Sequence, residues 1–205
     1  MKAKNILLIL VVVAMIVIVF QSLQDSQDDS AYIQKILDER QQTDRFMRSS
    51  NESPFAANRE SYNGLNYFPP DPRFRIIANF EPLPKKDLLL IYTNDGKEQQ
   101  YVRYGYAVFE LHGVKDSLLI LESVGVGPAR GKLFIPFGGA TSAIETYGAG
   151  RYLDVNHVRG SQTITLDFNK AYNPYCAYND TYSCPLPPRE NLLEVAIRAG
   201  EKNYK

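Results

Sequence analysis

The stretch "DLLLIYTNDGKEQQYVRYGYAVFEL", residues 87–111, decides the fold of this chain. Two runs rich in Leu, Ile, Val and Tyr flank the tripeptide Asn94-Asp95-Gly96, and such a turn between two such runs is a strong β-hairpin signal. In the second run the odd-numbered residues from Tyr101 to Phe109 alternate with the even-numbered residues from Val102 to Glu110. Because successive side chains of a strand point to opposite faces, this run predicts a strand with two different faces.

Similar short runs surround the hairpin, and each is bounded by Gly, Pro or polar turn residues. They are "RFRIIANFE" (73–81), "LLILESV" (118–124), "KLFIPF" (132–137), "RYLDV" (151–155) and "QTITLDF" (162–168). Closely spaced strands without long helical stretches between them favour an antiparallel barrel or sandwich. We therefore predict a mainly β domain, barrel-like or sandwich-like, over residues 53–205.

A helix is expected before this domain. Ile33, Ile36 and Leu37 fall near one side of residues 31–48, with charged residues elsewhere, and Ser30 is suited to cap a helix that begins at Ala31. The polar stretch "QSLQDSQDDS" before it is typical of a linker, so residues 24–52 are interpreted as a linker and an amphipathic helix. The default partner of the apolar side is the chain's own domain.

The N-terminus carries Lys2 and Lys4, followed by fifteen residues without a polar side chain, Ile6 to Phe20. Extended to Leu23, this run is close to the length of a membrane span. A cleaved signal peptide is the alternative, but the run ends in "IVFQSLQDS" and has no small-residue cleavage site. We favour a signal anchor over residues 1–23. The basic end then stays in the cytoplasm and the C-terminal domain is extracytoplasmic, periplasmic or extracellular; cleavage would give a secreted protein.

Composition and motifs exclude several functions. Lys plus Arg equals Asp plus Glu, at 23 each, so no net field indicates a nucleic-acid partner. "GVGPARGK", residues 125–132, has the wrong glycine spacing for a phosphate loop and precedes a predicted strand. The histidines, His112 and His157, lie 45 residues apart, which is not the spacing of a zinc site. We expect neither a metal site nor a cofactor.

Two segments carry a resemblance to a known family, namely "FIPFGGATSAIETYGAGRYLDV" (Phe134–Val155) and "LDFNKAYNPYCAYNDTYSCPLPPRENLLEVAIRAGEK" (Leu166–Lys202). Together with "SPFAANRESYNGLNYFPPDPRF" (53–74), they resemble the uncharacterised bacterial and archaeal family catalogued as domain of unknown function 1684. The family usually reads Asp-Ala-Thr-Ser-Gly where this chain has Gly139 to Ala143, so any chemistry of that aspartate would be absent. Prolines in the family favour an extended segment over "ENLLEVAIRAGE" (190–201). The resemblance supplies no activity.

Polar residues within these segments are candidates for a ligand site. The guanidinium of Arg151 can hold a carboxylate, phosphate or carbonyl, although an internal pair with Glu145, Asp154 or Asp167 is the simpler interpretation. Asp167 and Asn169 share a strand face. The candidate binding residues are Tyr147, Arg151, Asp167, Asn169 and Asn173. Nearby tyrosines at 172, 175, 178 and 182 either line a binding wall for a sugar or peptide or pack as a substitute core.

Three functions stay open on this basis. The leading hypothesis is a membrane-anchored binding or envelope-associated module with an unknown small-molecule or envelope ligand. The second is a hydrolase that uses Glu145, Asp154 or Asp167 as acid or base, which would require two carboxyls in one cleft. The third is a structural partner of a membrane complex, which would leave an apolar patch exposed on the helix over residues 31–48.

Cys176 and Cys184, the two cysteines of the chain, frame "CAYNDTYSC". An extracytoplasmic location favours a disulfide between them, and closing so short a loop restricts the unfolded chain by about 2.5 kcal/mol. A redox couple is less favoured than a disulfide staple, because the Cys-x-x-Cys spacing is absent. The resemblance implies that both cysteines also occur in members without an export signal, so buried free thiols stay open, with metal binding last.

Overall fold

The computed structural model describes residues 3–204, without the side chains of residues 3–12, 14 and 16–26. One long helix, α1 (Ala3–Ser49), is followed by a β domain. The strands are β1 (Arg75–Pro82), β2 (Leu88–Tyr92), β3 (Glu98–Leu111), β4 (Val114–Ser123), β5 (Leu133–Gly139), β6 (Arg151–Val155), β7 (Thr163–Asp167) and β8 (Leu192–Leu193). Short 3-10 turns lie at Arg59–Ser61, Pro72–Phe74, Gly127–Ala129, Phe168–Lys170, Tyr175–Ala177 and Arg189–Asn191.

The predicted hairpin is confirmed. β2 and β3 pair in antiparallel fashion from Leu88–Val102 to Tyr92–Glu98, and Gly96 adopts a φ of 78° in the turn between them. β3 alternates as expected, because Tyr101, Gly105 and Phe109 are buried. The residue at 105 must be glycine, since a Cβ there would lie 2.6 Å from the ring of Phe80.

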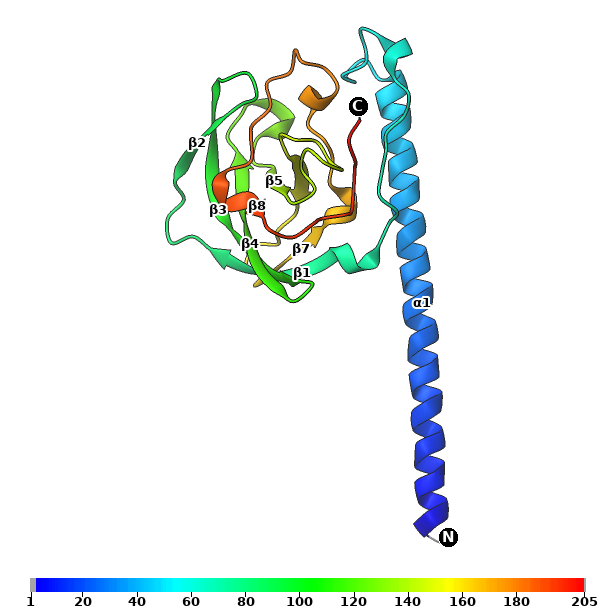
Figure 1. Cartoon of the computed structure of the whole chain (residues 1–205). Helices are drawn as coiled ribbons and strands as arrows, with labels where there is room; N and C mark the ends of the chain where they lie inside the picture. Colours follow the sequence, from blue (N-terminus) through cyan, green and yellow to red (C-terminus); the bar gives the residue numbers. More distant parts are fainter. Residues whose placement is uncertain (1–2, 205) are drawn as a thin grey trace.

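The strands form one curled sheet in the order β6-β5-β4-β3-β1-β7, with β2 beside β3. All of these pairs are antiparallel, whereas β8 pairs with β5 in parallel. The end strands β6 and β7 approach each other, so the sheet is a half-barrel, and the mainly β antiparallel prediction is confirmed (Figure 1).

The half-barrel closes around an apolar core. Strands β1 and β3 to β7 supply most of it, including Ala78, Phe109, Leu118 and Ile135. The C-terminal segment after β8 adds Ile197 and Ala199. This segment contains no α-helix, which agrees with the extended form expected for residues 190–201.

The helix differs from the prediction in where it begins. α1 is continuous from Ala3, so residues 24–30, which the sequence predicts as a linker, are helical. No Gly or Pro interrupts this stretch, and Gln, Ser and Asp each cost a helix only a few tenths of a kcal/mol. Its C-terminal half packs against the β domain as expected, while its N-terminal half extends beyond the domain (Figure 1).

Candidate functional site

A cavity of about 590 Å³ lies between the C-terminal half of α1 and the loops that follow β7. Its lining is mainly apolar, and six tyrosines contribute to it. These are Tyr67, Tyr152, Tyr172, Tyr175, Tyr178 and Tyr182. We call this space the tyrosine-lined cavity. Three predicted features meet here, namely the amphipathic helix, the tyrosine cluster and the cysteine loop.

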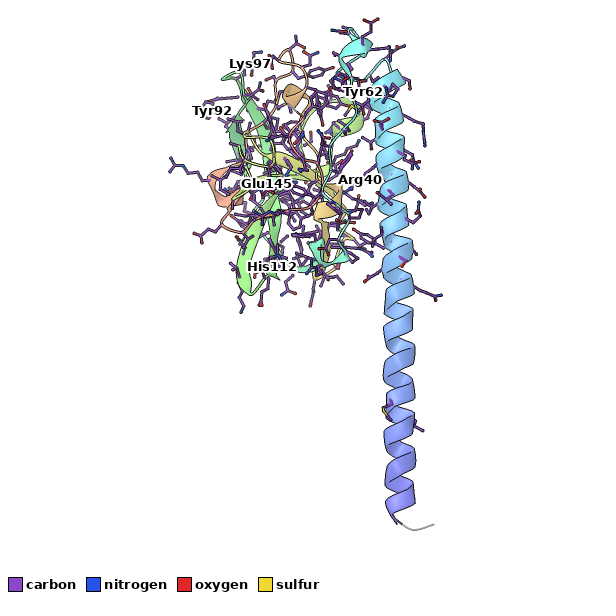
Figure 2. The ribbon with its side chains drawn as sticks, turned by 45° about the vertical axis from the view of Figure 1, so that its right-hand side comes forward. Arg40, Tyr62, Tyr92, Lys97, His112 and Glu145 are labelled. Atoms are coloured by element: carbon purple, nitrogen blue, oxygen red, sulfur yellow. The ribbon has the colours of Figure 1, made fainter. Side chains whose placement is uncertain are left out.

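The wall formed by α1 is fixed to the β domain by polar contacts and by buried apolar side chains. Tyr32 donates a hydrogen bond of 2.6 Å to Oδ1 of Asp167. Arg40 donates from Nη1 to the carbonyl of Phe68 at 2.8 Å and from Nη2 to that of Asn169 at 3.2 Å. Figure 2 shows Arg40 on the side of α1 that faces the β domain. Ile36 and Arg40 line the cavity one helical turn apart.

The opposite wall is the loop from Tyr172 to Pro185. Tyr178 is buried and packs against Phe55, with ring centroids 5.5 Å apart. Tyr175 and Tyr182 are half-buried and contact each other edge to face at 5.2 Å. The tyrosine cluster therefore packs as a core and also lines a cavity. The buried Tyr178 takes part in both, and Tyr172, Tyr175 and Tyr182 also line the cavity.

Glu201 lies at the base of the cavity and is buried. Its carboxylate accepts hydrogen bonds from Asn173 N at 3.0 Å, Asn173 Nδ2 at 2.9 Å and the Tyr178 hydroxyl at 2.5 Å. Burial raises the pKa of Glu201 to about 7, because the charged form loses its water, while these hydrogen bonds act in the opposite direction. A carboxyl at this position is therefore able to change its charge near neutral pH.

The turn at Gly200 places Glu201 at this position. Gly200 has a φ of 74°, and a Cβ on it would lie 2.5 Å from the carbonyl oxygen of Ala171. Only glycine accepts both the left-handed backbone and this close approach.

Arg151 lies behind the cavity and organises the C-terminal segment. The side chain is 2% exposed. Nη2 donates to the carbonyl of Ile197 at 2.8 Å, and Nη1 donates to the carbonyls of Ala199 and Glu201. Burial lowers the pKa of Arg151 to about 10. The internal role weighed for Arg151 is thus observed, but with backbone carbonyls in place of the carboxylates that the sequence suggested.

The remaining predicted binding residues are only partly brought together. Asn169 and Asn173 line the tyrosine-lined cavity, and both are hydrogen-bonded to the protein. Asp167 lies in a neighbouring groove, where Tyr32 holds it. Tyr147 contacts the cysteines instead, since its hydroxyl is 3.8 Å from Sγ of Cys176.

The proposed acid or base residues divide between two places. Glu145 is paired with Arg198 at 2.9 Å. Asp154 and Asp167 line the same groove of about 510 Å³, beside Lys35 and Arg75. Asp154 accepts a hydrogen bond of 2.9 Å from the Tyr172 hydroxyl.

Cys176 and Cys184 are buried free thiols that share a cluster with Tyr152. The predicted disulfide is therefore not formed in this structure, although the pair is in contact. The backbone N–H of Cys176 donates to Sγ of Cys184 at 3.3 Å. Cys184 also lines the tyrosine-lined cavity.

Two parts of the cavity were missed by reasoning from the sequence. Glu201 belongs to the Ala199-Gly200-Glu201 motif that supports the family resemblance, but nothing local marks it as buried. The α1 wall had a signal, because Tyr32, Ile36 and Arg40 recur every four residues and so share a helix face. Tyr32 and Arg40, on the same face as Ile36, can form hydrogen bonds, which indicates that this face makes polar contacts as well as apolar ones.

The predicted anchor lies mostly outside the described side chains. Of residues 6–20, the structure describes the side chains of Val13 and Met15, which are 50% and 54% exposed. Within the described part of the chain, no helix is long and apolar enough to cross a membrane.

Comparison with known proteins agrees with the sequence resemblance. The family described as protein of unknown function (DUF1684) matches residues 60–202. The solution NMR structure of an uncharacterised protein from Haloarcula marismortui is 34% identical, with a TM-score of 0.66. The similarity covers 86% of this chain and 96% of the archaeal one. No curated protein matches the chain.

Proposed function

The chain belongs to the DUF1684 family of unknown function, and we propose that it is a binding module that captures a small, largely apolar, ring-bearing molecule in the tyrosine-lined cavity. The observation that carries this proposal is the cavity itself. Its volume of about 590 Å³ falls within the range of small-molecule sites, and mostly apolar walls with a few buried polar groups are their usual composition.

The chemistry of the lining supports a ring-bearing ligand. Tyrosine faces favour stacked or edge-on contact with another ring, and tyrosine is rigid, so little side-chain entropy is lost on binding. The mainly apolar lining also carries charged groups, namely Glu39, Arg40 and Lys170, together with the titratable carboxyl of Glu201 at its base. A compact aromatic molecule with few polar atoms fits these walls better than a highly charged one.

We further propose that residues 1–23 hold the module at a membrane, with the β domain on the extracytoplasmic side. The uninterrupted apolar run from Ile6 to Phe20 and the two lysines before it support this location. In that compartment the Cys176–Cys184 disulfide can form, since an oxidising environment preserves such bonds.

Indole provides a direct test, because the chain contains no tryptophan, and excitation at the long-wavelength edge, where its 14 tyrosines absorb little, then reports the ligand. Thr43 lines the cavity on α1, and Gln42 is its exposed neighbour. We expect indole to bind the wild-type chain and Gln42→Phe equally, and Thr43→Phe at least about tenfold more weakly, because the added ring occupies the cavity. Equal binding by all three chains, or binding by none, would exclude the cavity as a ligand site.

A hydrolase remains the second candidate, because Asp154 and Asp167 line one groove. Paired carboxylates are the usual means of acid and base catalysis in glycoside hydrolysis. The test is a panel of chromogenic esters, glycosides and phosphates. Activity that Asp154→Asn and Asp167→Asn each abolish, and that Thr43→Phe leaves intact, would favour this function over simple binding.

A further inference from the structure

The two thiols are placed for chemistry with each other. Cys176 and Cys184 are 4% and 7% exposed and belong to one cluster. Seven residues separate them, including Tyr178 and Tyr182, which line the tyrosine-lined cavity. The cysteine loop is therefore both a possible covalent ring and a wall of the cavity.

The environment of the pair makes its two sulfurs unequal. A hydrogen bond from the Cys184 thiol, together with one from the Tyr147 hydroxyl, holds the pKa of Cys176 below its usual value despite burial. Donating that hydrogen bond, in addition to burial, raises the pKa of Cys184. The lowered pKa and the contact with the Tyr147 hydroxyl, 3.8 Å from its Sγ, favour the thiolate at Cys176, and the thiolate is the nucleophilic form of cysteine.

We propose that Cys176 and Cys184 form a peroxide-reactive dithiol whose oxidation to a disulfide tightens ligand binding in the tyrosine-lined cavity. The ligand part of this inference rests on the proposed function, whereas the thiol chemistry does not. Hydrogen peroxide is little larger than water, and Cys184, which contacts Cys176, lies on the cavity wall, so the cavity brings the oxidant to the Cys184 side of the pair.

The reaction balances in two steps. The Cys176 thiolate attacks one oxygen of hydrogen peroxide, the O–O bond breaks, and hydroxide leaves as Cys176 becomes a sulfenic acid. Cys184 then loses its proton and attacks the Cys176 sulfur, the S–O bond breaks, and water leaves as the disulfide forms. The Cys184 proton leaves with the departing hydroxyl as water, and the hydroxide of the first step takes up the proton that Cys176 released on forming its thiolate. Overall, two thiols are oxidised and one peroxide is reduced to two waters.

The bond would act on the cavity through the loop that it closes. Tyr178 packs against Phe55 and donates to Glu201, and Tyr182 packs against Tyr175. Joining the ends of this loop removes alternative conformations of the wall, and a wall already held in its bound form loses less entropy on binding. Immobilising one side chain in advance corresponds to about two- to tenfold in affinity.

The experiment uses the full-length chain, purified in detergent and reduced, as wild type and as Cys184→Ser and Cys176→Ser variants. Intact mass is measured after hydrogen peroxide treatment, with dimedone present in a parallel sample to trap sulfenic acid. We expect the wild type to lose two hydrogens, Cys184→Ser to stop at a trapped sulfenic acid on Cys176, and Cys176→Ser to react far more slowly. Peptide mapping of trapped wild-type protein locates the sulfenic acid even if a variant does not fold.

Indole affinity is then compared between reduced and oxidised wild type, with Cys184→Ser as the chain that cannot close the ring. Tighter binding by about two- to tenfold, in the oxidised wild type alone, supports the inference. Failure to form the disulfide overturns the thiol chemistry. A disulfide that leaves indole affinity unchanged overturns the coupling while the binding site stands, and absence of indole binding in both states points instead to failure of the proposed function.

Discussion

Two buried ionisable residues, Arg151 and Glu201, hold the C-terminal segment in place through hydrogen bonds. Arg151 satisfies three carbonyls that the loop leaves without strand partners, and Glu201 satisfies the backbone and side chain of Asn173. Buried backbone groups must find partners, and a chain that leaves regular structure inside a core needs side chains to supply them. These two residues therefore stabilise the base of the cavity before any ligand is considered.

Replacing Arg151 by methionine should destabilise the protein severely. The substitution keeps much of the apolar side-chain volume but leaves the carbonyls of Ile197, Ala199 and Glu201 unsatisfied, at about 3 kcal/mol or more in the free energy of unfolding. Urea denaturation measures this loss. Arg159→Met, at an exposed position, is the matched control and should change stability by under about 0.5 kcal/mol. Similar stabilities for the two variants would contradict the role assigned to Arg151.

Glu201 should make stability depend on pH in an unusual direction. Its pKa in the folded protein, about 7, lies above its ordinary value of 4.5, so the folded state holds a proton that the unfolded state releases. This contribution is fully present below about pH 4.5 and is lost as the pH rises to about 7, by up to about 3 kcal/mol. We expect Glu201→Gln to flatten this decline in the free energy of unfolding.

Denaturation curves between pH 4 and 8 provide the measurement for Glu201. The slope is the informative quantity, because glutamine also changes the hydrogen bonds and so alters stability at every pH. Glu194→Gln, which removes an exposed carboxyl a few residues away, should keep the wild-type slope. An unchanged slope in Glu201→Gln would show that this carboxyl titrates in the same way in both states.

At the scale of elements, the C-terminal half of α1 is a wall of the cavity and also part of the fold. Three of its side chains hold it to the β domain. Tyr32 donates to Asp167, and Glu39 forms an ion pair with Lys170. Arg40 donates to the carbonyls of Phe68 and Asn169. In the described part of α1 from residue 27 onward, Leu37 is the sole exposed large apolar residue, at 38%. The helix thus offers no apolar patch there, which disfavours the hypothesis of a structural partner bound to residues 31–48.

Weakening this wall should loosen the helix before the sheet unfolds. Ile36 is 1% exposed, and Ile36→Ala removes buried volume at a cost of about 2–5 kcal/mol. We expect faster amide hydrogen exchange over residues 31–49 and little change in β3 and β4. Leu37→Ala, on the next residue but facing solvent, is the control and should leave exchange nearly unaltered. Uniformly faster exchange in Ile36→Ala would mean that helix and sheet open as one unit.

For the molecule as a whole, the long helix α1 has one half docked on the β domain and one half that is not (Figure 1). Its C-terminal half is bound to the β domain, and its N-terminal half extends away from that domain (Figure 1). A rigid helix without Gly or Pro between the two halves would set the distance of the cavity from any surface that holds the N-terminus.

The proposed anchor makes a prediction about location. The full-length chain should sediment with membranes, and alkaline phosphatase fused after the β domain should be active, because that enzyme folds only outside the cytoplasm. A chain without residues 1–26 should lose both properties. The double substitution Val12→Arg with Ile16→Arg keeps the full length of the chain but places two charges in the apolar run, each costing about 2.5–3.5 kcal/mol at a membrane centre. It should therefore lose both properties as well. An active soluble fusion from that variant would argue against an anchor.

The local elements follow from the amino-acid sequence alone. The Asn94-Asp95-Gly96 turn, the alternation from Tyr101 to Phe109 and the apolar side of residues 31–48 depend on neighbours along the chain, so β2, β3 and the docked part of α1 were predictable. The family was also predictable from its C-terminal motifs. The start of α1 was not, because a polar stretch without Gly or Pro is equally compatible with a linker and with a helix extended from both sides.

Where these elements meet depends on the packing of the whole domain. The curl of the sheet brings the end of the chain beside β6, so Arg151 binds carbonyls 46 to 50 residues away instead of the carboxylates near it in sequence. The same folding encloses Glu201, draws Cys184 to a cavity wall and places Tyr147 beside Cys176. Burial and long-range contacts arise only when segments distant in the sequence pack together. Burial and neighbouring groups set the pKa of a carboxyl, and the packed segments set the shape of a cavity.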